Sequence, residues 1–150
     1  MDFSELMNLY KKLGGDFIEF KKTSAQIDVG FKFSLSKKIS EVDVQLFGLI
    51  SGDLNPIHFD ENFAKKTKFA GRVVHGMLTT SLVSNAVATL PGIVVLLETS
   101  FNYLAPVRIG DIVRVECEIV EKEKNRYKIR VECKVGDKKV VGGWVRILLW

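Results

Sequence analysis

The loop Ser51–His58 carries residue types that can move a proton near neutral pH. Asp53 and His58 lie on either side of Asn55-Pro56, a turn dipeptide that can bring their side chains together. A carboxylate and an imidazole that share one water form a general acid/base pair. An ordinary turn uses the same residues, with Asp53 closing an Asx-turn and His58 as a structural hydrogen-bonding group. The spacing alone leaves both interpretations open.

Gly76, directly after His75, is the second candidate, because it begins an apolar helical segment. Backbone N–H groups in the first turn of a helix are unpaired and carry positive partial charge. A glycine there lets a substrate carbonyl approach without a Cβ in the way. This pattern is typical of an oxyanion hole, although a plain tight helix entry would look the same.

Other site chemistries find no support in the residue spacing. Cys117 and Cys133 form no CxxC motif, and together with two histidines they give no zinc spacing. The glycine-rich nucleotide motifs and the GxSxG elbow of hydrolases are absent. We therefore expect no metal site and no bound cofactor.

Hydrophobic periodicity predicts the elements that position these residues. Residues 75–90 are apolar or small at nearly every position, which is typical of a buried helix. Strands are expected over residues 31–36, 93–104, 111–121, 126–136 and 139–150. Four consecutive strands joined by tight turns form an antiparallel sheet, and we expect it to wrap the buried helix in an α+β fold.

Two further helices are expected before the buried one. Residues 3–13 are amphipathic, and we expect this helix to dock on the body of the protein. Residues 40–52 begin at Ser40, a capping residue, and end at Gly52. A polar loop over residues 53–58 and a short helical turn starting at Asp60 should follow.

The cysteines allow a prediction of strand register. A turn centred near Asn125 would pair two inward-facing sets of residues and place Cys117 directly opposite Cys133. We expect reduced thiols, because the site is apolar and the protein is expected in the reducing cytoplasm.

The composition fits one domain of ordinary size and excludes a disordered or collagen-like chain. The formal net charge is +4, and no basic stretch is interleaved with aromatic residues. A nucleic-acid partner is therefore disfavoured against a phosphorylated small molecule. No segment reaches the ~20 apolar residues of a membrane helix, and the first residues lack a signal peptide's apolar region.

Three stretches together resemble the MaoC-like dehydratase family, also called the (R)-specific enoyl-CoA hydratase family. They are Phe47–Asp60 (FGLISGDLNPIHFD), Gly71–Met77 (GRVVHGM) and Phe101–Asp111 (FNYLAPVRIGD). The resemblance covers roughly residues 29–150 and leaves residues 1–28 as an N-terminal helical extension.

The resemblance implies a hot-dog fold, a homodimer and reversible hydration of a trans-2-enoyl thioester of CoA or acyl carrier protein, in fatty acid metabolism. By motif, Asp53 and His58 match the family's catalytic pair, and Gly76 matches its oxyanion donor. Asn55 shapes the loop, and Ser84 occupies the place of a hydroxyl that supports the aspartate. No cofactor is implied, because coenzyme A is part of the substrate.

Two positions depart from the family pattern, and two other functions stay open. Phe47 stands where many members have Tyr, and Arg72 where many have Pro. We expect neither to touch the catalytic pair, although either can alter substrate preference. The alternatives are an acyl-CoA thioesterase and a non-catalytic acyl-CoA-binding module.

Overall fold

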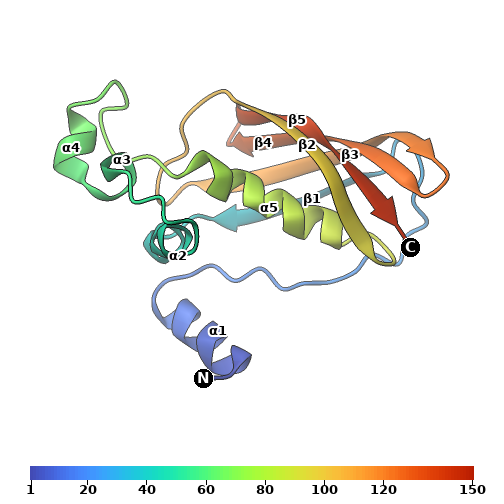
Figure 1. Cartoon of the computed structure of the whole chain (residues 1–150), viewed down its shortest axis with the longest axis horizontal. Coiled ribbons are helices and arrows are strands. Elements are labelled where there is room, and N and C mark those ends of the chain that lie inside the picture. Colours follow the sequence, from blue (N-terminus) through green and yellow to red (C-terminus); the bar gives the residue numbers. More distant parts are fainter.

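The computed structural model describes residues 1–150 and shows one curved antiparallel sheet around a central helix (Figure 1). The strands are β1 (Lys32–Lys38), β2 (Val94–Tyr103), β3 (Ile112–Glu123), β4 (Arg126–Val135) and β5 (Lys138–Leu149). Their order across the sheet is β1-β3-β4-β5-β2, and every neighbouring pair is antiparallel. The hot-dog fold and the α+β class expected from the sequence are confirmed.

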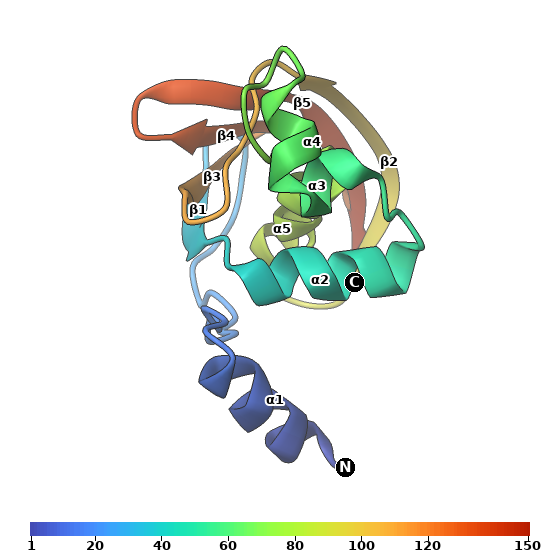
Figure 2. The ribbon, with the colours of Figure 1, turned by 90° about the vertical axis from the view of Figure 1, so that its left-hand side faces the viewer.

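The helices are α1 (Phe3–Lys12), α2 (Glu41–Ser51), α3 (Pro56–Phe59), α4 (Glu61–Lys65) and α5 (Gly76–Ala88). Helix α5 lies inside the curve of the sheet, whereas α2, α3 and α4 gather at its N-terminal end (Figure 2). All three predicted long helices form within two residues of their expected ends. No helix is long and apolar enough to cross a membrane.

The polar loop expected over residues 53–58 is partly helical, which corrects the prediction. Asn55 caps α3 by accepting a hydrogen bond from the Ile57 N–H at 3.3 Å, and Pro56 takes the first helical position. Proline suits that position because its fixed φ is helical and the missing N–H has no partner there in any case. This single turn carries His58 and sets the direction of its side chain.

The core lies between α5 and the concave face of the sheet. Alternate strand residues such as Val115, Ile129 and Val145 are fully buried and meet Leu82 and Val83 of the helix. The helix is not buried all round as expected, because Met77, Ser81 and Ser84 on one side are exposed. That side faces β2, where the sheet ends and packing stops.

The cysteine register is wrong by two residues. Cys117 pairs with Val131, and Cys133 pairs with Val115. The turn is centred between Lys124 and Asn125 instead of on Asn125, which shifts the pairing by one residue, and a bulge between Ile119 and Glu121 shifts it by one more. Both thiols are free and face the core, and burial raises the pKa of Cys117 to about 12 and of Cys133 to about 11. The expected cytoplasmic location stays a prediction.

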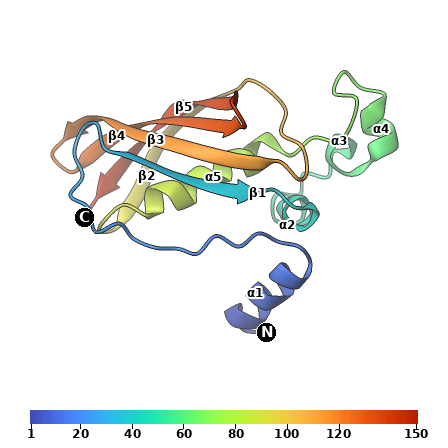
Figure 3. The same ribbon diagram turned by 180° about the vertical axis from the view of Figure 1, so that it is seen from behind.

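Helix α1 does not dock as expected. It has no buried residue, and it stands away from the sheet in every view (Figure 3). Its contact with the body is Tyr10, whose hydroxyl donates to Asp43 Oδ1 of α2 at 2.5 Å and accepts from Lys37 Nζ of β1 at 2.6 Å. The helix is amphipathic, but this chain offers its apolar side no partner.

Lys37 and Asp43 form a buried ion pair beneath Tyr10, with 3.3 Å between Nζ and Oδ2. Lys37 also donates to the Asp16 carbonyl, and Asp43 accepts from the backbone N–H of Ser40. The pair therefore joins the extension, the edge strand β1 and the start of α2. Its position matters to the site, because α2 leads directly into the loop that carries Asp53.

We predict that Lys37→Met lowers the free energy of unfolding by about 3–5 kcal/mol, because it leaves the Asp43 carboxylate buried without a cation. The double variant Lys37→Met/Asp43→Asn should lose less, because no buried charge remains while the amide oxygen can still accept hydrogen bonds. Urea unfolding followed by circular dichroism measures both. A double variant less stable than the single one would contradict this account.

Candidate active site

The structure brings Asp53, His58 and His75 together at the N-terminal end of α5. The His58 Nε2 atom lies 3.9 Å from Asp53 Oδ2. That distance is too long for a direct hydrogen bond, so the two groups face each other across a gap. The side chain of Asp53 is 49% exposed, whereas that of His58 is 11% exposed.

The tautomer of His58 follows from its one backbone partner. Its Nδ1 lies 2.7 Å from the Val73 carbonyl oxygen, which can only accept, so Nδ1 carries the proton. Nε2, the ring nitrogen 3.9 Å from Asp53 Oδ2, is then left unprotonated. Burial lowers the pKa of His58 below 6.5, and the neighbouring His75 and Arg72 lower it further, against the opposing effects of Val73 and Asp53. His58 is therefore placed as an unprotonated base at neutral pH.

His75 is a site residue to which the sequence analysis gave no role of its own. Its ring stacks on His58 with centroids 3.8 Å apart and an interplanar angle of 27°. Its Nε2 donates to the Asp53 backbone carbonyl at 3.0 Å, which holds the loop of Asp53 over the helix. Its position next to Gly76 in the sequence could have indicated a role for His75 in the site. The stacking on His58 could not be predicted, because it depends on how α3 packs against α5.

One ligand atom from each of the three side chains lies within 4.8 Å of the other two, which is close enough for a shared metal ion. The stacking of the two imidazoles argues against that use. Nitrogen lone pairs lie in the ring plane, so an ion in the plane of one stacked ring lies outside the plane of the other. The arrangement fits proton transfer better than metal binding.

Gly76 begins α5, so its N–H has no partner within the helix. A Cβ built on Gly76 would come within 2.9 Å of the ring of Tyr103, which packs directly over it. Position 76 therefore requires glycine, because the Tyr103 ring lies too close to leave space for a Cβ. Its free N–H and the helix dipole give this point a positive potential.

A cavity of about 450 Å³, here named the histidine cavity, is lined by His58, Gly76, Thr79 and Tyr103 among others. Thr79 is 1% exposed, and its hydroxyl has no hydrogen-bond partner. Buried polar groups without a partner are rare, and they commonly mark a place for a ligand or ordered water. The cavity therefore combines a base, an amide donor and an unused hydroxyl.

The supporting residues are placed differently from one another. Asn55 caps α3 and its N–H donates to Asp53 Oδ1 at 3.1 Å, so it does shape the loop. Ser84 makes no hydrogen bond to Asp53 and lines a second cavity, described below. Its supporting role stays a prediction.

Of the two departures from the family pattern, Arg72 contacts His58, contrary to the expectation that it would not touch the catalytic pair, whereas Phe47 packs beside His75. Arg72 Nε donates to the His58 backbone carbonyl at 2.7 Å, and its guanidinium forms a bidentate pair with Glu41 at 2.8 and 3.1 Å. The ring of Phe47 lies 4.9 Å from the ring of His75. Arg72 thus anchors the helix that carries His58.

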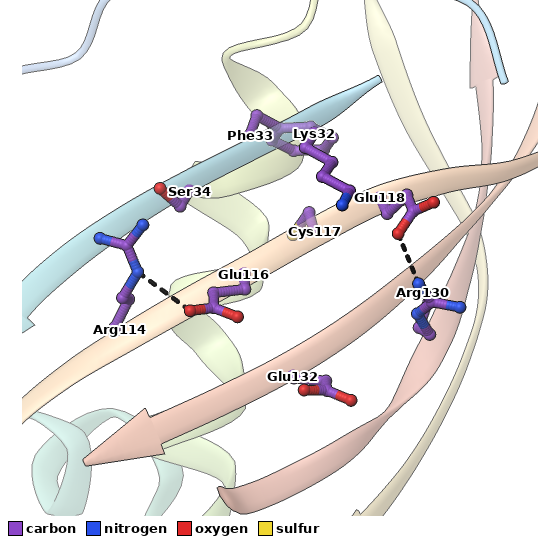
Figure 4. Close-up of a pocket in the computed structure, with 9 residues that line it drawn as sticks. All are labelled: Lys32, Phe33, Ser34, Arg114, Glu116, Cys117, Glu118, Arg130 and Glu132. Atoms are coloured by element: carbon purple, nitrogen blue, oxygen red, sulfur yellow. Dashed lines mark hydrogen bonds and ion pairs between the residues drawn. The ribbon is translucent and has the colours of Figure 1, made fainter. Parts of the chain in front are cut away.

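Another hollow lies on the outer face of the sheet, away from α5 (Figure 4). Most of its charged side chains pair with neighbours, such as Arg114 with Glu116 at 3.1 Å, and Arg130 with Glu118. Glu116 also meets Lys134 at 2.9 Å, which lowers the pKa of that carboxyl. Because its acids and bases neutralise each other on an open surface, we place no function there.

Comparisons with known proteins agree with this geometry. Residues 22–141 match the family model described as MaoC like domain. A 3-hydroxybutyryl-CoA dehydratase of Methylorubrum extorquens is 44% identical over 121 residues, with 78% of this chain and 77% of that protein covered.

Two solved structures are similar over most of the chain. A protein of Archaeoglobus fulgidus has 59% identity and a TM-score of 0.96, with 98% of this chain and 94% of that chain covered. The (R)-hydratase of A. caviae, described as involved in PHA biosynthesis, has 30% identity and a TM-score of 0.79, with 85% and 100% covered. This chain therefore belongs to the MaoC-like domain family.

Proposed function

We propose that the protein catalyses the reversible hydration of a trans-2-enoyl thioester to the (R)-3-hydroxyacyl thioester. The observation that carries this proposal is the unprotonated Nε2 of His58 at 3.9 Å from Asp53 Oδ2, together with the free N–H of Gly76 at the start of α5. The names of similar proteins, a 3-hydroxybutyryl-CoA dehydratase and an (R)-hydratase, support the same reaction.

The gap of 3.9 Å between His58 Nε2 and Asp53 Oδ2 is one that a single water can bridge. In hydration, the water oxygen bonds to C3 of the enoyl group while a water proton passes to His58. The electron pair of the C2–C3 double bond moves toward the thioester, and the pair of side chains returns a proton to C2. One water is thus added across the double bond, and no metal or redox cofactor takes part.

The negative charge that develops on the thioester oxygen requires a donor, and the Gly76 N–H at the start of α5 supplies one. An oxyanion donor of this kind contributes about 3 kcal/mol to transition-state stabilisation, comparable to the contribution of the base. The unpartnered Thr79 hydroxyl lines the same cavity and is available to the bound acyl group.

The alternative functions receive less support. A thioesterase must direct its water at the thioester carbonyl, but here the acid/base pair and the amide donor are arranged as in a family of hydratases and dehydratases. A binding module needs neither Asp53 nor His58, and this chain has both in proton-transfer geometry.

We further propose a homodimer formed through β2, which is one edge of the sheet. Exposed edge strands invite pairing, and proteins that block pairing often place lysines there. The other edge, β1, exposes Lys32 and Lys38, whereas β2 has no lysine and exposes Leu96 and Leu97. A second copy paired on β2 would also cover the exposed side of α5, so the thioester would be bound between subunits.

We predict that Asp53→Asn and His58→Gln each lower kcat about 10²–10⁴-fold with little change in KM, because each removes a positioned proton carrier. The double variant should be scarcely slower than either single one, because the pair acts as a unit. Hydration of crotonyl-CoA followed by absorbance, with resolution of the product enantiomers, measures this. Near-wild-type kcat in either single variant would reject the assignment.

The lowered pKa of His58 predicts the pH dependence. The base must be unprotonated, so kcat/KM should stay constant from neutral pH down to about 6.5 and fall only below it. The imidazole titration measured by NMR should follow the same curve. In Asp53→Asn the pKa should drop further, because the carboxylate charge that raises it is gone. A pKa above 6.5 in the wild type would contradict the dominant effect of burial on this imidazole.

We predict that the wild type sediments at twice 16.9 kDa. Leu97→Lys should shift it toward the monomer, because it puts a charge on the edge that pairs. Ile112→Lys is a matched control, since Ile112 is at least as exposed as Leu97 but lies on the interior strand β3. A monomeric wild type with full activity at nanomolar concentration would exclude the dimer.

A further inference from the structure

A second cavity shares one lining residue, Tyr103, with the histidine cavity. This apolar cavity, of about 440 Å³, lies between the exposed side of α5 and the concave face of β2. Its lining includes Met77, Ser84, Val87, Leu96 and Phe101. Tyr103 lines both cavities, and it stands at the end of β2 where they adjoin.

The position of Tyr103 is fixed from two directions. Its ring packs on Gly76, where any Cβ would come within 2.9 Å of it. Its hydroxyl lies 3.2 Å from Thr80 Oγ1 on the next turn of α5. The side chain nevertheless remains about half exposed and belongs to no part of the buried core. The side chain is therefore held by one hydrogen bond and by packing of its ring on Gly76. A substitution at position 103 removes both contacts and leaves the buried core intact.

The contents of the two cavities differ in chemistry. The histidine cavity holds His58, Gly76 and the unpartnered Thr79 hydroxyl, so it suits the thioester carbonyl and the reacting carbons. The apolar cavity has no charged residue in its lining, and its polar groups are hydroxyls, three from α5 and those of Thr99 and Tyr103 from β2. It suits the saturated tail of an acyl chain, and a chain whose thioester lies at Gly76 must pass Tyr103 to reach it.

We propose that Tyr103 sets the acyl chain length that the protein accepts, by closing the histidine cavity against the apolar one. With the ring in place, a four-carbon enoyl group fits beside His58 and longer tails are excluded. This inference rests on the proposed function, and it assigns Tyr103 a role in specificity and none in proton transfer.

The test is the ratio of kcat/KM for trans-2-octenoyl-CoA to that for crotonyl-CoA. In Tyr103→Ala the ratio should rise at least about tenfold, because burying one methylene is worth about fourfold in affinity and four more methylenes gain a cavity. Tyr103→Phe keeps the ring but loses the Thr80 bond, so its ratio should rise less. Tyr103→Leu serves if the alanine variant fails to fold. Met77→Ala is the matched control: it widens the apolar cavity without opening the boundary, and its ratio should stay within about twofold of the wild type.

Two results would overturn the proposal. One is a wild type that already accepts the octenoyl substrate as well as the crotonyl one. The other is a set of Tyr103 variants in which kcat/KM falls in parallel for both substrates, which is what a purely structural role predicts.

Failure of the proposed function is a separate result, namely a wild type that hydrates neither substrate. The role of Tyr103 is then decided by calorimetric binding of butyryl-CoA and octanoyl-CoA, which are not turned over. Tyr103→Ala should favour the octanoyl ester relative to the wild type, and equal preference in both proteins would reject the role.

Discussion

The site depends on one hydrogen bond, from His58 Nδ1 to the Val73 carbonyl. It fixes the tautomer, and the tautomer decides whether Nε2 faces Asp53 as a base or as a donor. Val73 can serve as the acceptor only because its own segment is held: its N–H donates to the Ile57 carbonyl at 3.2 Å, and the Val74 N–H donates to the Val107 carbonyl at 2.8 Å. The proton chemistry therefore rests on backbone geometry contributed by three separate stretches of chain.

Arg108 explains why the motifs at residues 47–77 and 101–111 occur together. It lies in the connection between β2 and β3, and its guanidinium donates to the carbonyls of Phe69, Gly71 and Arg72. These bonds clamp the segment that ends in Val73 onto the sheet. The five donors of a guanidinium point outward from one rigid plane, so they reach carbonyls spread along a loop, whereas a lysine offers three donors on a single nitrogen. A motif far from the acid/base pair in sequence thus controls its geometry.

Most features that depend on residues close together in the sequence were predicted correctly. The capping residue Ser40 and the glycine at position 52 marked the two ends of α2, and period-two alternation located the strands. The pairing of Asp53 with His58 across a turn was also readable. Contacts between distant segments were not: the His75 stack requires α3 to meet α5, and the bulge at Ile119 that shifts Cys117 has no signature in the alternation. The amphipathic pattern of α1 indicated an apolar side but not whether this chain would cover it.

Helix α5 shows how one element can serve packing and chemistry at once. Leu82, Val83 and Ala86 bury one side against the sheet, and the N-terminus gives its free N–H to the site. The remaining side uses small residues, Ser81, Ser84 and Ala88, so that the space against β2 stays open instead of being filled. Larger apolar residues there would bury more surface and add stability at about 25 cal/mol per Å². They would also remove the cavity. The small residues therefore lower the stability of the fold and keep the cavity open. They lie on the side of the helix that faces β2, the strand whose edge is unpaired.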